Sequence, residues 1–123
     1  MARTMSTSGS AQYLGTEVAG KWWKRYRAPG FSARGNGKYW FEDGELRFHR
    51  ALTKHHTRIP LGLVTGVLIG TKHAGTWNAG RPVVKVAWAL DGQQLSSGFR
   101  FGDRPSADAL AAEIESRRPG TAG

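Results

Sequence analysis

The chain has 123 residues, 39% of them hydrophobic and 22% charged, which suits one globular domain. The length excludes a multidomain enzyme and a (β/α)₈ barrel, which needs about 250 residues. Because cysteine is absent, disulfide frameworks, thiolate zinc sites, iron–sulfur clusters and cysteine nucleophiles are excluded too. The net charge of +9, from 18 Lys and Arg against 9 Asp and Glu, points to an anionic partner: nucleic acid, a membrane surface or an acidic protein.

No segment predicts export or a membrane span. The longest largely apolar stretch, residues 59–70, has 12 residues, whereas a transmembrane helix needs about 20. The N-terminus lacks the apolar core of a secretory signal. We therefore expect a cytoplasmic protein, either free or peripheral to the inner face of the membrane.

Both ends of the chain predict flexible tails around one domain. The N-terminal residues are rich in Ser, Thr, Gly and Ala, and they bury too little surface to offset the entropy of ordering. We expect a tail over residues 1–18, a single domain over 19–118 and a short tail over 119–123.

The domain opens with a basic and aromatic segment, AGKWWKRYRAPGFSARGNG, at residues 19–37. The spacing of Trp22, Trp23 and Tyr26 fits one short helical turn, and a strand or an extended arm fits as well. The structure of this segment is left open.

A β-hairpin is predicted next by Asp43-Gly44, which separates two runs of alternating residues. Asp-Gly favours a type I′ turn, which needs positive φ at both central residues. A two-residue turn sets Phe41 opposite Leu46 and Tyr39 opposite Phe48 on the buried face.

Two short strands are expected over residues 57–61 and 65–70, followed by a Gly-rich loop over 71–81 that carries Trp77. A second hairpin then surrounds Asp91-Gly92, between residues 82–90 and 93–101. Its turn chemistry and its apolar alternation agree, with Trp88 opposite Leu95.

One amphipathic helix is predicted over residues 106–118, followed by Pro119-Gly120, which stops it. Ser106 or Asp103 is suited to cap its start. Its apolar stripe follows helical spacing and consists of Ala107, Leu110, Ala111 and Ile114. The helix is expected to dock on the strands before it.

Four segments together resemble the pleckstrin-homology (PH) superfold, and most closely the small bacterial PH-like and GRAM-like domains. They are GKYWFEDGELRFHR, TRIPLGLVTGVLIG, RPVVKVAWALDGQQLSSGFRF and the helix. The resemblance implies an α+β, mainly β fold: a bent antiparallel β-barrel of six to seven strands capped by one C-terminal helix. Six strands are counted, and the seventh is expected within residues 21–27 or 53–60.

The resemblance also implies a binding module without catalysis, and it does not fix the partner. Lipid-binding PH domains carry basic residues flanking the first hairpin loop. Counted from the predicted strands, that loop is residues 42–45, which is acidic. Arg47 and Arg50 alone approach the basic pattern there.

No motif of a hydrolase, a P-loop enzyme or a zinc protease occurs, so no catalytic residue and no enzymatic activity are predicted. The adjacent His55 and His56 face opposite sides of a strand, and His49 and His73 complete the histidines. We predict no metal site and no cofactor.

The partner-binding candidates are basic and aromatic. Such residues suit an anionic membrane interface, where indoles lie at headgroup depth, or a nucleic-acid backbone, where aromatics stack on bases. Alternatively, the aromatic residues of 19–37 pack against the barrel. The candidates are Lys21, Trp22, Trp23, Lys24, Arg25, Arg27, Arg34, Lys38, Trp40, Arg47, Trp77 and Arg81. Trp40 and Arg47 are expected opposite each other, within reach of a cation–π contact.

The predicted function is that of an adaptor that engages a protein partner or an anionic lipid surface through this basic and aromatic face. A small nucleic-acid-binding protein is the alternative. No small-molecule substrate is inferred, and the sequence makes no prediction of the oligomeric state.

Overall fold

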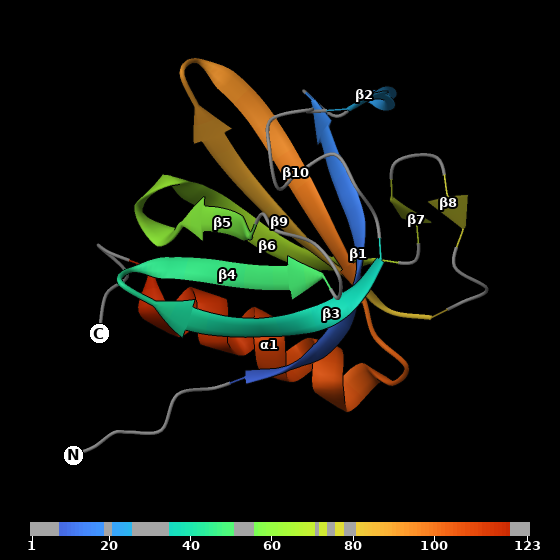
Figure 1. The fold of residues 1–123 in the computed structure, drawn as a ribbon. Coiled ribbons are helices and arrows are strands. Elements are labelled where there is room, and N and C mark those ends of the chain that lie inside the picture. The colour runs from blue at the N-terminus through green and yellow to red at the C-terminus, as the bar shows by residue number, and fades with distance from the viewer. Residues whose placement is uncertain are drawn as a thin grey trace.

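An antiparallel sheet and one C-terminal helix make up the fold in the computed structural model (Figure 1). The structure describes residues 8–18, 21–25, 35–50, 56–70, 72–73, 76–77 and 81–118, of which 21–25, 72–73 and 76–77 are described by their backbone alone.

The main sheet has the strand order β5-β4-β3-β1-β10-β9-β6. Its strands are β1 (Ser8–Val18), β3 (Gly35–Glu42), β4 (Glu45–Arg50), β5 (Thr57–Pro60), β6 (Val64–Gly70), β9 (Val83–Leu90) and β10 (Gln93–Arg100). The remaining elements are β2 (Lys21–Arg25), which pairs with β1, the two-stranded ladder of β7 (Lys72–His73) and β8 (Thr76–Trp77), the 3₁₀ turn η1 (Leu61–Leu63), and α1 (Arg104–Arg117). Among the described strands β5 and β6 do not pair, so the sheet is bent but not closed.

Strand β1 joins the two halves of this bent sheet. It pairs with β3 from Ser8 to Tyr13 and with β10 from Gln12 to Val18. The register with β10 shifts between Tyr13 and Thr16, and Gly15 has a φ of 97° within that shift. Glycine adopts this left-handed conformation without steric cost, so the irregularity lets the strand bend from one half of the sheet to the other.

Both predicted hairpins are confirmed. Asp43 and Gly44 have φ angles of 53° and 73°, and Asp91 and Gly92 have 50° and 80°. Positive φ at both central residues is the type I′ geometry that matches the twist of the flanking strands. The predicted registers of β3 with β4 and of β9 with β10 are confirmed as well.

The core lies between the inner face of the sheet and α1. Its largest fully buried side chains include Trp88, Tyr13, Phe48 and Phe99. The rings of Tyr13, Phe48 and Phe99 contact one another with centroids 5.4–5.7 Å apart. These residues come from β1, β4, β9 and β10, so the core ties both halves of the sheet together.

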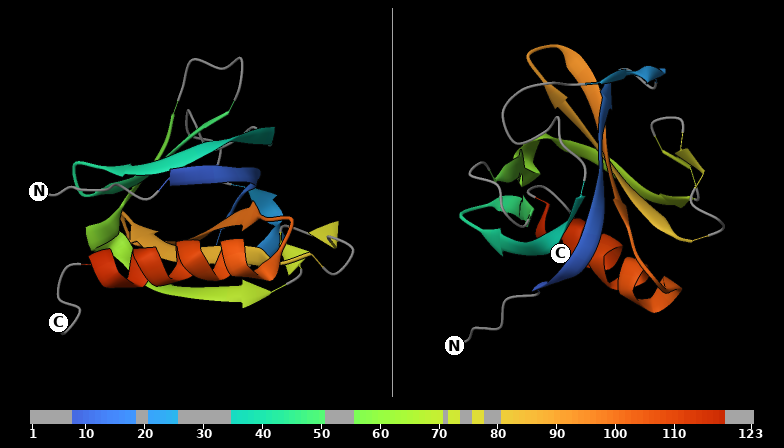
Figure 2. Two further views of the ribbon diagram at one scale, coloured as in Figure 1. Left: turned by 90° about the horizontal axis from the view of Figure 1, so that it is seen from below. Right: turned by 45° about the vertical axis from the view of Figure 1, so that its right-hand side comes forward.

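Helix α1 lies across the opening between the β3–β4 side and the β6–β9 side of the sheet (Figure 2). Ala107, Leu110 and Ile114 of the predicted stripe are fully buried. The helix begins two residues earlier than predicted, and Asp103 caps it by accepting a hydrogen bond from the Ser106 N–H at 2.7 Å. No helix in the described part of the chain is long and apolar enough to cross a membrane.

The expectation of a flexible tail over residues 1–18 is wrong for residues 8–18, which form the central strand β1. Its last eight residues are all buried except Gln12. The polar, small-residue composition concealed a strand that gains its stability from neighbours on both sides. β1 is therefore the seventh strand of the bent sheet. A strand does form within 21–27, as β2, but it lies outside the main order.

This strand also changes which loop comes first. The first connection of the main sheet runs from β1 to β3 and contains residues 19–34, which are most of the basic and aromatic segment. The acidic residues 42–45 belong to the second connection, so reading them as the first hairpin loop is wrong.

Candidate functional site

A cleft of about 790 Å³ lies on the side of the sheet that faces away from the core. It is formed by β1, β3 and β4 together with the segments that lead into β9 and out of β10. Its lining consists of Ser10, Ala11, Gln12, Asn36, Gly37, Lys38, Trp40, His49, Arg81, Arg100, Phe101 and Gly102.

Strand alternation places one row of the lining. Tyr39 and Phe41 of β3 point into the core, so Lys38 and Trp40 point outward. Lys38 lies between Ser10 of β1 and His49 of β4, because cross-strand partners share a face. A cation in the middle of the sheet surface thus has polar neighbours on both sides.

A second row lies one residue pair further along β1. Gln12 has Asn36 of β3 on one side and Arg100 of β10 on the other. The Phe101 N–H donates a hydrogen bond to the Pro82 carbonyl at 3.0 Å, which fastens the segment carrying Arg81 beside the end of β10. Arg81 and Arg100 therefore contribute to the same end of the cleft.

The cleft is cationic. Its lining contains no Asp or Glu, and Lys38, Arg81 and Arg100 form no ion pair with any described carboxylate. An arrangement of this kind raises the local concentration of anions.

The cleft also holds an unsatisfied acceptor. The Oε1 atom of Gln12 is buried and has no hydrogen-bond donor among the described residues. Such an atom costs free energy unless water or a ligand supplies a donor, since buried polar groups are normally paired.

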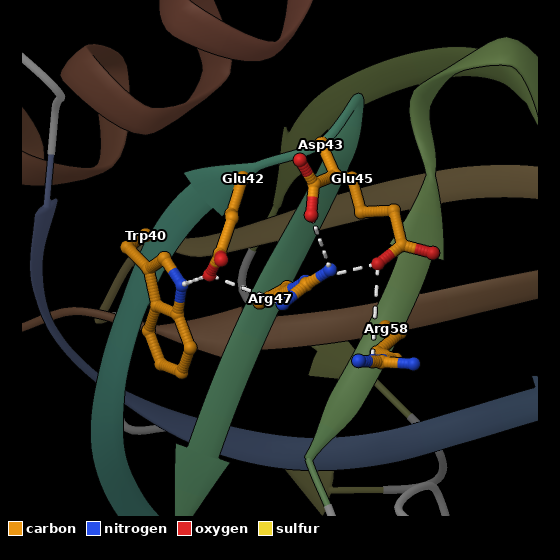
Figure 3. Close-up of polar contacts among 6 residues, drawn as sticks. All are labelled: Trp40, Glu42, Asp43, Glu45, Arg47 and Arg58. Atoms are coloured by element: carbon orange, nitrogen blue, oxygen red, sulfur yellow. Dashed lines mark hydrogen bonds and ion pairs between the residues drawn. The ribbon is translucent and has the colours of Figure 1, made fainter.

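Arg47 is not among the lining residues, and its guanidinium is held by three acidic side chains (Figure 3). Its side chain, only 11% exposed, contacts Glu42 at 3.1 Å, Asp43 at 3.4 Å and Glu45 at 2.9 Å. The Trp40 indole N–H donates to Glu42 at 2.9 Å. That hydrogen bond, and secondly the Arg47 charge, lower the pKa of Glu42. The guanidinium of Arg47 is thus held by carboxylates, and the expected cation–π contact with Trp40 is replaced by a bridge through Glu42.

Two histidines meet beside Trp40. The ring centroids of His49 and His56 are 4.6 Å apart, and the Trp40 ring stands edge-on to His56 at 5.4 Å. Partial desolvation, with smaller contributions from His49 and then Arg58, lowers the pKa of His56. The described residues include no group of three or more side chains suited to hold a metal ion.

The structure brings together three of the predicted partner-binding residues, namely Lys38, Trp40 and Arg81, and sets Arg47 apart. Lys21, Trp22, Trp23, Lys24 and Arg25 form β2, and Trp77 lies in β8, all described by backbone alone. Arg27 and Arg34 lie outside the described residues.

Sequence reasoning missed Arg100 and Gln12, and it considered His49 only as a metal ligand. Arg100 was detectable, because it alternates with the buried Phe99 and Phe101 and must point outward. Gln12 was hidden in the segment interpreted as a tail.

A family model described as bacterial PH domain-like matches residues 2–115. A search of curated proteins finds no match. PH-like domains are in general binding modules, so the match supports a binding module as the general class of this chain. The match includes β1 and ends within α1, so it covers the whole bent sheet and nearly all of the helix. By its strand order, its C-terminal helix and this match, the chain belongs to the bacterial PH domain-like family.

Proposed function

We propose that this chain is a non-catalytic binding module that attaches to an anionic membrane surface through a basic and aromatic face. One observation carries the proposal: Lys38, Arg81 and Arg100 line one cleft without a carboxylate among them. Cations that form no ion pair within the described part of the chain are available to an external anion.

The charges are sufficient for reversible attachment. Each Lys or Arg close to an anionic leaflet contributes about 1 kcal/mol. Three such residues supply about 3 kcal/mol, a factor of about 150 in affinity at low salt. Because the surface potential decays over a Debye length of about 8 Å at physiological ionic strength, attachment should weaken as salt is added.

The sequence of the connection between β1 and β3 also suits a membrane surface. Its residues 19–34 include Trp22 and Trp23, a residue type that lies at headgroup depth in membranes. β2 pairs with β1 at Glu17 and Val18, on the strand that also lines the cleft. In lipid-binding PH domains, basic residues flank the connection that occupies this place in the fold.

The test is co-sedimentation of the full chain with vesicles of phosphatidylcholine alone or mixed with phosphatidylglycerol, at low and at physiological salt. We expect binding to the anionic vesicles only, weaker at the higher salt. Lys38→Glu and Arg100→Glu should each lower the affinity about fivefold or more. Lys85→Glu makes the same charge change on β9 outside the cleft and should have a smaller effect.

Absence of binding to both kinds of vesicle would refute the membrane proposal. A steeply salt-dependent affinity for RNA or DNA in the same preparation would favour the nucleic-acid alternative instead. Equal losses for Lys38→Glu and Lys85→Glu would show that net charge, and not the cleft, determines attachment.

A further inference from the structure

We propose that two copies of this chain associate through the outer edge of β6, as an antiparallel strand pair about a two-fold axis at Val67. β6 is the last strand in the sheet order, and none of its residues lines the cationic cleft. The inference therefore goes beyond the proposed function and uses a separate surface, so that either can fail without the other.

The two edges of the main sheet differ in their protection against pairing with another chain. β5 has four residues and carries Arg58 and Pro60, and short length, charge and proline all discourage such pairing. β6 has seven residues, VTGVLIG, with no charge and no proline. It pairs with β9 on one side and with no described strand on the other. Alternate residues of β6 therefore direct their N–H and C=O groups away from β9, where a further strand can bind them.

The outward face of β6 combines a protruding side chain with an open space. Leu68 is 58% exposed and is the only large hydrophobic side chain that is exposed among the described residues. Gly66 lies two residues away on the same face, and a Cβ placed there would meet nothing within 4 Å. A pair centred on Val67 sets Leu68 of each copy opposite Gly66 of the other. Each leucine then covers the open glycine, and both copies make the same contact.

Neighbouring registers fit less well than the one centred on Val67. A centre at Leu68 sets Gly66 opposite Gly70, so the open space at Gly66 stays unfilled. A centre at Gly66 sets Leu68 opposite Val64, across the register shift that interrupts the strand between Val64 and Gly66. A slip by a single residue would turn the side chains of one strand to the opposite face.

Helix α1 runs beside β6 and contacts it, so the flank of α1 on that side would also approach the second copy (Figure 2). The opposite flank is identified by Arg117, whose guanidinium lies 4.6 Å from the ring centre of Phe41 on β3. Helical spacing then places positions 104, 108, 111 and 115 toward β6. The charges at this side of the helix cancel in two ion pairs, Arg104 with Asp108 at 2.9 Å and Arg118 with Glu115 at 2.6 Å.

Charge favours a second copy as the occupant of this edge. Because the chain carries a net charge of +9, contact between most parts of its surface and another copy is repulsive. The cation beside β6 on β9 is Lys85, which pairs with Leu68. In the proposed pair the two Lys85 backbones are three strand spacings apart and offset by two residues, about 16 Å, or about twice the Debye length at physiological ionic strength. A charged partner would find no compensating charge on β6, whereas an identical uncharged strand needs none.

Sedimentation velocity of the full chain over a hundredfold range of concentration measures the association. One strand pair with its flanking helices makes a small interface, so we expect a weak dimer that dissociates on dilution. Leu68→Lys should weaken it about tenfold or more, because a lysine on an edge strand opposes pairing and the apolar contact is lost. Gln94→Lys adds the same charge at an exposed position of β10 and should change the affinity less than about twofold.

An exchange of two residues tests the register. Leu68→Gly should weaken the dimer, because the glycine of the other copy is no longer covered. Adding Gly66→Leu should restore most of the affinity, since a leucine again lies opposite a glycine on both sides of Val67. The space at Gly66 is open, so the added side chain does not disturb the fold, and unaltered thermal unfolding checks this for each variant. A double variant no better than Leu68→Gly would overturn the register.

Hydrogen exchange locates the contact, because the β6 amides should exchange more slowly as the concentration rises. A chain that stays monomeric at every concentration would overturn the inference. A dimer that Leu68→Lys leaves intact would overturn it too, since another surface would then hold the copies together. Protection of the β6 amides in a monomer, independent of concentration, would assign the edge to another segment of the same chain and would likewise overturn the inference.

Discussion

The bend in β1 is held by a buried chain of hydrogen bonds, which Ser97→Ala would cut. The hydroxyls of Tyr13 and Thr16 lie 2.6 Å apart, and those of Thr16 and Ser97 also lie 2.6 Å apart. The Trp88 indole N–H donates to Ser97 Oγ at 3.0 Å. Ser97 is fully buried, so the chain links β1, β9 and β10 out of contact with water.

The cost of Ser97→Ala follows from what the hydroxyl leaves behind. Alanine differs by one oxygen, so the cavity term is small. Thr16 keeps its bond to Tyr13, but the Trp88 N–H loses this acceptor. The substitution removes two buried hydrogen bonds of the Ser97 hydroxyl, each worth about 1 kcal/mol, so we expect about 2 kcal/mol of unfolding free energy to be lost. For a chain of 123 residues, whose unfolding entropy is about 0.26 kcal/mol/K, that lowers Tm by about 8 °C.

Urea unfolding followed by far-UV circular dichroism measures this loss. Ser96→Ala is the matched control, because Ser96 is the neighbouring residue on the outward face and is only half-buried. We expect the control to change the unfolding free energy by less than about 0.5 kcal/mol. A Ser97→Ala variant as stable as the wild type, or one no less stable than the control, would refute the role given to this chain of hydrogen bonds.

Three further predictions concern backbone packing and titration. Gly37→Ala should strongly lower Tm, because its Cβ would collide with the His49 carbonyl oxygen, whereas Gly62→Ala meets nothing within 4 Å; equal Tm values would contradict this. The hydrogen bond from the Ser106 N–H lowers the pKa of Asp103. The stabilisation by Asp103 is therefore present above the unfolded pKa of about 3.9 and is lost as pH falls through the folded pKa. In Asp103→Asn the unfolding free energy should fall less steeply with decreasing pH in this acid range. NMR titration should find the pKa of His56 below the usual value, and Arg58→Ala should raise it, because a nearby cation is removed; an unmoved pKa would exclude that cause.

Local signals predicted the hairpins, while non-local pairing decided the rest. An Asp-Gly turn and its flanking alternation lie within about a dozen residues, so the β3–β4 and β9–β10 registers could be predicted. β1 could not, because it has a register shift at its bend and depends on β3 and β10 on either side. Because β1 was not predicted, each later connection between strands was numbered one place too early.

The candidate site was likewise predictable only where local patterns determine it. Lys38 and Trp40 followed from alternation within one strand. Arg100 and Gln12 become neighbours only once β1 lies between β3 and β10, and no local pattern shows that. Arg47 is the opposite case: its acidic partners lie within five residues of it, so its neutralisation could have been inferred from the sequence.

The position of β1 also constrains the order of folding. Thr16 and Ser97, which are hydrogen-bonded in the core, are 81 residues apart in the chain. During synthesis β1 leaves the ribosome before every other described strand, yet β10, which completes its pairing, leaves last. Long-range closures of this kind carry a high contact order and slow the search for the native state. The pairing of the central strand β1 with β10 can therefore form only after nearly the whole chain has been synthesised. Until then the two halves of the sheet are not joined, and α1 lacks the surface on which it packs.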